Sequence, residues 1–275
     1  MNKSVTNRRL WFLPLVAFLS PVEAATSIVT SGSASGLGMD VDLSLLVLDV
    51  GVGPFAEADV SAPSPDTDSA QVLGLNVDIV ATLVTLGSVQ AAALDASASS
   101  NIDGFSATGN STGAGSVTGL SFSLGTGGLI SLSTGGAGDV ISSTSSSSGS
   151  YGSLSSIGTS TLENVTLNIG STSFNLSSTY SPNTELNVSA AGVAGVRVFL
   201  NEQTVSGDGI SDSYMTTNAI RIDVDAVDLG GSLGIVSGDI IIGQSMSGLD
   251  AIPEPQAAVS IGLAGMLLLL RRRKS

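Results

Sequence analysis

The chain has 275 residues and contains no cysteine and no histidine, which excludes disulfide scaffolds, thiol catalysis and any serine–histidine catalytic triad. Of its 23 acidic residues, all but Glu23 and Glu254 lie in residues 25–253, whose only basic residues are Arg197 and Arg221, so this stretch carries a net charge of −19. Such a surface repels phosphate backbones, and we therefore expect no nucleic-acid partner.

Residues 1–24 have the three features of a secretory signal peptide. Basic residues at Lys3, Arg8 and Arg9 precede a ten-residue apolar run over 10–19, and Val22 and Ala24 place small residues at the −3 and −1 positions of a cleavage site. The apolar run is about half as long as a membrane-spanning helix, which favours a cleavable signal over an anchor. We predict export with cleavage after Ala24, by either the general or the twin-arginine route.

Alternation of apolar and polar residues dominates the body, over residues 25–250. A period of two residues is typical of a strand with one buried face. Five segments follow it: Met39–Leu45, Leu75–Ile79, Leu120–Leu124, Val165–Ile169 and Ile220–Asp225. Leu45–Leu48 and Ile240–Ile242 are apolar on both faces and predict central strands, whereas Ser88–Ala98 fits a helix or a strand.

The body has the composition of an all-β domain. Gly-, Asn- and Pro-containing turns separate the short strands, and 11 of the 19 residues in 142–160 are serine, which predicts a flexible excursion between strands. A Ser/Thr strand edge and an O-glycosylated stretch are the other interpretations of that segment. We predict one antiparallel β-sandwich-like domain with Gly/Ser-rich loops; a β-solenoid is the alternative, although no fixed repeat is present.

No catalytic constellation is visible in the body, and we expect a non-enzymatic protein without a cofactor. Calcium is the ligand to weigh, because hard cations prefer carboxylate and carbonyl oxygens. The segment 208–212 and the nearby Asp223, Asp225 and Asp228 supply such oxygens, but they lack the EF-hand pattern. We expect Arg197 and Arg221 to pair with neighbouring carboxylates.

The C-terminal segment 251–275 predicts a membrane anchor. Pro253, Glu254 and Pro255 precede an uncharged apolar stretch over 257–270, which would be about 21 Å long as a helix. The stretch is shorter than the ~30 Å hydrocarbon core, but Arg side chains can snorkel and the bilayer can thin. The cluster Arg271, Arg272, Arg273 and Lys274 predicts a cytoplasmic C-terminus and a body on the outer side.

This order of a Pro-Glu-Pro triplet, an apolar helix and an Arg-rich terminus resembles the PEP-CTERM sorting signal of Gram-negative bacteria. The resemblance implies that an exosortase, a membrane protease of the transpeptidase kind, recognises Pro253, Glu254 and Pro255. It further implies that 257–270 is a transient anchor and that Arg271–Lys274 stop transfer at the inner membrane.

The body resembles a second family, the choice-of-anchor P proteins of bacterial surfaces, in the segments 36–41, 52–54, 218–222 and 238–243. That resemblance implies a surface address and no reaction. Taken together, these features predict an exported surface or matrix protein that is tethered at the inner membrane and then processed to the cell surface or medium. The alternative is a calcium-dependent or carbohydrate-binding adhesin module, with extracellular polysaccharide as a partner.

Overall fold

A computed structural model describes residues 27–45, 48–81, 84–230 and 233–253. These residues belong to one compact unit, which is described here by itself. The predicted signal peptide and residues 254–275 lie outside the described residues.

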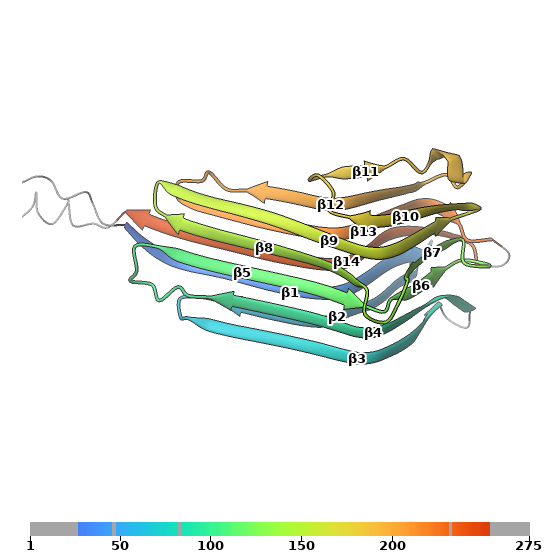
Figure 1. Ribbon diagram of the computed structural model, residues 1–275, viewed down its shortest axis with the longest axis horizontal. Coiled ribbons are helices and arrows are strands. Elements are labelled where there is room, and N and C mark those ends of the chain that lie inside the picture. The colour runs from blue at the N-terminus through green and yellow to red at the C-terminus, as the bar shows by residue number, and fades with distance from the viewer. Residues whose placement is uncertain (1–26, 46–47, 82–83, 231–232, 254–275) are drawn as a thin grey trace, which may run out of the picture. The chain divides into compact units, whose positions relative to one another are not determined.

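The described chain is almost entirely β-strand, which confirms the expected all-β fold (Figure 1). The strands form two antiparallel sheets, so the β-solenoid alternative is not the arrangement found. A short 3-10 turn, η1 (Ser189–Ala191), is the one helical element in the described ranges. No helix within those ranges is long and apolar enough to span a bilayer. The strand bounds are β1 (Ser27–Leu45), β2 (Leu48–Ser61), β3 (Asp66–Ala81), β4 (Val84–Ser100), β5 (Gly109–Thr118), β6 (Ser121–Leu124), β7 (Ile130–Thr134), β8 (Val140–Ser150), β9 (Ser153–Ile169), β10 (Thr172–Ser178), β11 (Thr184–Leu186), β12 (Val196–Ser206), β13 (Asp212–Asp228) and β14 (Ile235–Pro253).

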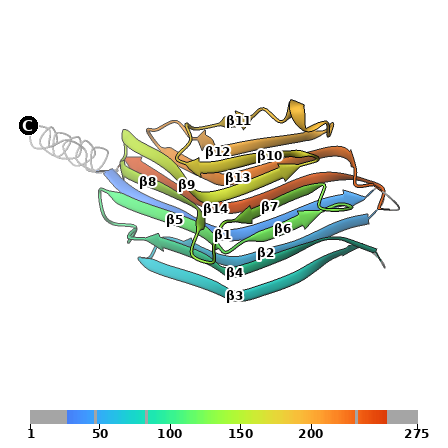
Figure 2. The ribbon, with the colours of Figure 1, turned by 45° about the vertical axis from the view of Figure 1, so that its right-hand side comes forward.

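The six-stranded sheet has the order β11-β12-β13-β14-β1-β2. The last strand, β14, therefore lies between β13 and the first strand, β1 (Figure 2). The apolar run Ile240–Ile242 lies in β14, so its prediction as a central strand is confirmed. Leu45–Leu48 is not a central strand, because Leu45 ends β1 and pairs with Leu48 at the start of β2.

The eight-stranded sheet is built around two long strands, β4 and β9. The first part of β9 pairs with β8 and its last part pairs with β7, while β4 pairs with β3 on one side and with β5 and β6 on the other. The segment 88–98, which the sequence left open between helix and strand, lies in β4. Residues 142–160 are not a flexible excursion: they form the β8–β9 hairpin, with Ser143 opposite Ser160.

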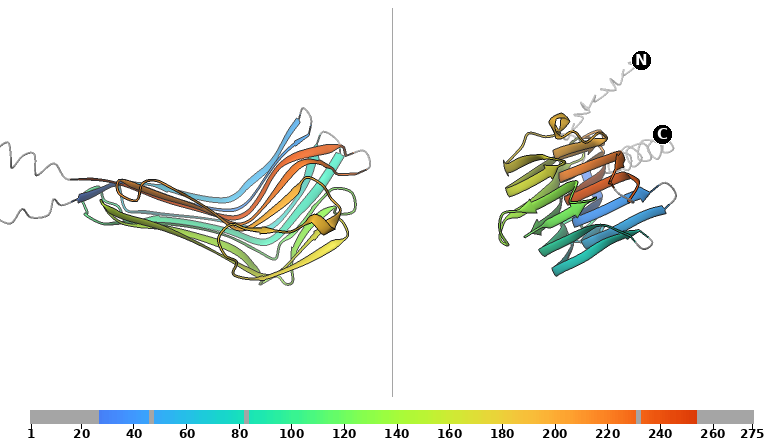
Figure 3. Two further views of the ribbon diagram at one scale, coloured as in Figure 1. Left: turned by 90° about the horizontal axis from the view of Figure 1, so that it is seen from above. Right: turned by 90° about the vertical axis from the view of Figure 1, so that its right-hand side faces the viewer.

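All the long strands bend midway along their length (Figure 3, left). At the bend, a residue with a positive φ angle interrupts the alternation of buried and exposed side chains. Beyond that residue, the alternation resumes one position later. In β9, Asn164 has a φ of 47° between buried Leu162 and buried Val165, and in β14 Gly243 has a φ of 62°. Such bulges kink a strand and re-aim its side chains.

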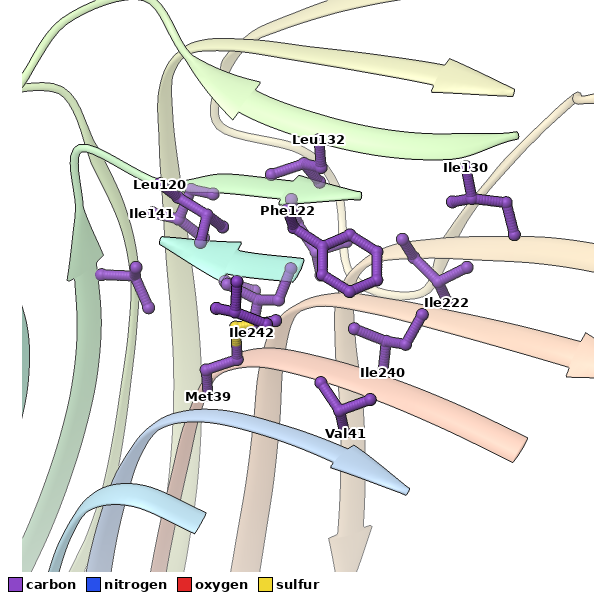
Figure 4. Close-up of a cluster of buried hydrophobic side chains, with 14 of the residues drawn as sticks. Met39, Val41, Leu120, Phe122, Ile130, Leu132, Ile141, Ile222, Ile240 and Ile242 are labelled. Atoms are coloured by element: carbon purple, nitrogen blue, oxygen red, sulfur yellow. The ribbon is translucent and has the colours of Figure 1, made fainter. Parts of the chain in front are cut away.

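On one side of the bend, which we call the hydrophobic half, large side chains fill the space between the sheets. Phe122 and Leu132 of the eight-stranded sheet lie near Ile222, Ile240 and Met39 of the other sheet (Figure 4). Each of these side chains is at most 1% exposed. A buried side chain of this size contributes roughly 1.5–3 kcal/mol, so this half supplies most of the hydrophobic stabilisation.

On the other side of the bend, the serine-rich half, the sheets are joined by hydroxyl groups. Ser145 of β8 is fully buried and hydrogen-bonds to Thr217 Oγ1 at 2.9 Å and to Ser245 Oγ at 2.9 Å. Ser147 likewise bonds to Ser247 at 2.8 Å. Because each hydroxyl both donates and accepts, serines can satisfy one another without water.

The glycines of β5 let the two sheets of the serine-rich half approach closely. A Cβ atom on Gly113 would lie 2.1 Å from the backbone oxygen of Ser35 and 2.3 Å from that of Met246. Sheets usually pack about 10 Å apart, a spacing set by their side chains, and here the backbones are nearer to each other than that.

Candidate functional site

The two ends of the described domain are neighbours. Ser27 at the start of β1 pairs with Pro253 at the end of β14. Pro253 is exposed, and Ile252 before it is 49% exposed, whereas Ala251 is the last buried side chain. Of the sorting residues predicted from the sequence, Pro253 is the one that lies within the described residues. Ala24, Glu254, Pro255 and Arg271–Lys274 lie outside them.

The acidic turn between β12 and β13, considered above for calcium, is organised by its own backbone. The Oδ1 atom of Asp208 accepts hydrogen bonds from the amides of Ile210 at 2.7 Å and Ser211 at 2.6 Å, and Oδ2 accepts one from the Ser211 hydroxyl at 3.0 Å. These bonds stabilise the carboxylate and lower the pKa of Asp208 strongly. Asp208 therefore closes a turn in the manner of an Asx motif.

The other acidic residues considered for calcium lie apart from that turn. Asp223 of β13 stands opposite Asp239 of β14, Asp225 is exposed, and Asp228 accepts the amide of Gly230 at 2.9 Å. No group of three or more Asp or Glu side chains within the described ranges is arranged to hold a metal ion.

The two basic residues of the body lie close together on the outer face of the six-stranded sheet, each paired with acids as expected. Arg221 donates to Glu202 at 2.9 Å and to Asp239 at 2.8 Å. Arg197 donates to Glu185 at 3.2 Å, and both guanidinium groups approach the ring of Phe199. These contacts neutralise the neighbouring carboxylates. Both guanidinium groups are thereby engaged, so neither forms a binding site for an external anion.

The described residues form open hollows, and one of about 400 Å³ beside β9 is lined by two carboxylates, Asp139 and Glu163. Asp139 there accepts a hydrogen bond from the side-chain amide of Asn164 at 3.1 Å. A hollow of about 460 Å³ lies beside β11 and the start of β12. Among the residues that line it, Glu185 is the one titratable side chain, and Glu185 is already paired with Arg197. General acid–base chemistry needs two such groups at defined separations, and this hollow does not provide them.

The feature that distinguishes the surface is an array of small polar side chains on the outer face of the eight-stranded sheet. Three successive cross-strand rows run from β3 through β4, β5 and β8 to β9. We call these fifteen residues the hydroxyl face: Thr67, Ser99, Thr112, Ser146 and Ile157; Ser69, Ser97, Ala114, Thr144 and Thr159; Gln71, Asp95, Ser116, Ser142 and Thr161.

The hydroxyl face is uncharged apart from Asp95, which accepts a hydrogen bond from Gln71. None of its side chains is buried, whereas the alternate residues of β5 and β8 point into the serine-rich half. Sequence reasoning missed this face because it treated residues 142–160 as a loop. The strict alternation of β8, in which Ser143, Ser145 and Ser147 are buried, carries no hydrophobic signature.

No protein-family model, curated protein or solved structure matches this chain. The two surfaces from which function can be argued are therefore the paired ends of the domain and the hydroxyl face.

Proposed function

We propose that the protein is a non-enzymatic surface or matrix protein that is exported, tethered at the inner membrane by residues 251–275, and released or re-anchored by an exosortase. The observation that carries the proposal is the pairing of Ser27 with Pro253 at one end of the domain. The predicted signal peptide thus ends just before β1 begins, and the predicted sorting segment 251–275 begins in the last three residues of β14.

The position of Pro253 suits a segment that is removed after export. All the described strands are complete at this residue, and the last buried side chain is Ala251. Cutting the chain beyond Pro253 would therefore remove no strand and no described core side chain. Prolines at 253 and 255 lack amide donors and disfavour the helical conformation before them, so the stretch around Glu254 favours an extended conformation that a protease cleft can bind.

Charge supports the direction of export. The body carries −19, and four of the nine basic residues form the cluster Arg271–Lys274. Basic residues beside an apolar segment are retained on the cytoplasmic side, which leaves the acidic body outside.

The second candidate function is a binding module, and the hydroxyl face favours it. A carbohydrate partner fits this uncharged polar surface. Calcium is less suited to the acidic turn between β12 and β13, because the carboxylate of Asp208 already accepts hydrogen bonds from the amides of its own loop. Binding and sorting are compatible, since they use different parts of the chain.

The test of sorting is the processing of the full chain in cells with and without an exosortase. We expect the chain to be shortened at its C-terminus in the first host and intact in the second. Glu254→Ala should block shortening, whereas Glu57→Ala, which removes an exposed carboxylate from β2, should not. Equal processing in the two hosts would rule out the proposed sorting route.

A further inference from the structure

We propose that the hydroxyl face binds an uncharged polysaccharide chain that lies flat across strands β3, β4, β5, β8 and β9. The inference deepens the binding function proposed above and rests on it. It assigns the surface and the chemistry of the partner, and it is independent of how the C-terminus is processed.

Charge restricts the partner first. The hydroxyl face has no cationic side chain and a single carboxylate, Asp95, while the body as a whole carries −19. An acidic polymer, a phosphate group or an anionic membrane would be repelled by the surrounding field and would find no counter-charge on the face. A cationic partner would be drawn to the acidic parts of the surface and not to this face, whose one carboxylate already accepts a hydrogen bond from Gln71. The face therefore suits an uncharged partner.

Hydrogen-bonding capacity restricts it next. Eleven of the fifteen side chains are Ser or Thr. Within the described residues, bonds between two side chains of the face are limited to Thr112 with Ser146 at 3.3 Å and Gln71 with Asp95. The other hydroxyls can each donate and accept, which matches a ligand that is itself covered with hydroxyl groups.

Geometry favours an extended ligand. Neighbouring strands place side chains about 4.8 Å apart, and same-face residues along a strand recur about every 6.7 Å. Among the described residues, one open hollow touches the face, at Thr161 in the third row, and the others are lined by residues outside the three rows. A small molecule would have no enclosure here, whereas a polymer with a regular repeat can make the same contact at successive strands.

A second copy of the chain is the competing occupant. Three rows on five strands cover about 500 Å², and a stable interface needs roughly 800 Å² from each partner. Two copies would also bring two bodies of −19 together. A polysaccharide avoids both costs, because many copies can bind along one neutral chain and gain avidity.

The test uses the full-length chain, purified in a mild detergent, with microcrystalline cellulose as the uncharged probe and alginate gel as the acidic one. We expect retention on cellulose that is insensitive to salt, and no retention on alginate. The double variant Thr144→Val with Thr159→Val removes two hydroxyls from one cross-strand pair in the middle row of the face. It should weaken binding to cellulose about tenfold, since each net hydrogen bond contributes roughly 0.5–1.5 kcal/mol.

The matched control is Thr204→Val with Thr216→Val, a cross-strand threonine pair on the outer face of the other sheet. It should leave binding unchanged, and Thr144→Ser, which keeps the hydroxyl, should bind like the unmodified chain. Failure of the unmodified chain to bind cellulose, an equal loss in the control pair, or a doubling of mass in light scattering would each overturn the assignment. None of these binding results bears on the processing of the C-terminus. The sorting proposal is tested separately, by comparing processing in hosts with and without an exosortase.

Discussion

Replacing Gly113 with alanine tests whether the backbones of the two sheets are in contact in the serine-rich half. The added methyl group would lie 2.1 Å from the carbonyl oxygen of Ser35 and 2.3 Å from that of Met246. Both atoms belong to central strands of the opposite sheet, so neither can turn aside as a flexible side chain can. The sheets must separate locally, and the hydroxyl bonds beside them must stretch.

The magnitude follows from the cost of overpacking. An extra methylene in a well-packed core costs about 1–3 kcal/mol, and the contact with two backbone oxygens places Gly113→Ala at or above ~3 kcal/mol. For a domain of this size, that loss lowers the melting temperature by about 6–12 °C. Gly51→Ala is the matched control, because Gly51 also lies in a strand but has no atom within 4 Å of the added Cβ. Its effect should stay within about 0.5 kcal/mol.

Urea unfolding of the purified chain, followed by far-ultraviolet circular dichroism, measures both variants against the unmodified chain. The midpoint of Gly113→Ala should fall clearly while that of Gly51→Ala stays in place. Equal midpoints for the two variants would show that the sheets are not in backbone contact, and the description of the serine-rich half would be refuted.

Three further substitutions test the hydrogen-bonded groups. Ser145→Ala should cost about 1–3 kcal/mol in urea unfolding, because its partners lose a buried donor and acceptor, whereas the exposed Ser148→Ala should cost almost nothing. Arg221→Gln should cost about 1–2 kcal/mol and lose much of its effect at high salt, whereas Arg197→Gln, with a side chain 56% exposed, should cost less than ~1 kcal/mol. The Tyr214 hydroxyl donates to Asp250, which raises the pKa of Tyr214 to about 12, so the stability that it contributes is present below about pH 10 and is lost as the pH rises through about 12. Melting curves of Tyr214→Phe should therefore lie below those of the unmodified chain at neutral pH and converge with them in strong base.

For each of these variants, a specific result would contradict the prediction. An unchanged urea midpoint for Ser145→Ala would mean that water, and not the serine network, satisfies the buried hydroxyls. Equal salt-independent losses for the two Arg variants would contradict the ion-pair network around Arg221. A constant difference between Tyr214→Phe and the unmodified chain across the alkaline range would contradict the bond to Asp250.

The hydrophobic half of the fold could be predicted from the sequence because its strands follow the alternation of large apolar and polar residues. Met39–Leu45 and Val165–Ile169 lie in strands as expected. Each of these segments also lies wholly on one side of the bend, where the period of two residues is uninterrupted. Hydrophobic burial fixes the register of such strands, since a slip of one residue would expose the core.

The serine-rich half could not be predicted in this way. Its inward residues include Ser143, Ser145 and Gly113, which are poor markers of burial when judged by hydrophobicity. They are buried because hydroxyls from facing sheets satisfy one another, and that is a property of the assembled pair of sheets. The bend was missed for a related reason: Ala56 adopts a positive φ angle that alanine seldom shows, and Asn164, of a type that more often adopts such angles, lies directly before a segment whose alternation predicts an ordinary strand.

The two candidate functional surfaces also differ in whether the sequence alone could reveal them. The sorting motif is a local sequence pattern, and it was predicted without the fold. The hydroxyl face joins residues from Thr67 to Thr161 through the pairing of five strands, so no segment of the sequence contains it.

The measurement that tests the central claim most directly is the intact mass of the protein isolated from its own cells. Export and processing predict a chain that lacks residues 1–24 at one end and has lost the apolar stretch 257–270 and the Arg cluster beyond Pro253 at the other. A soluble cytosolic product with the full mass of 27.3 kDa and both termini untrimmed would contradict the account.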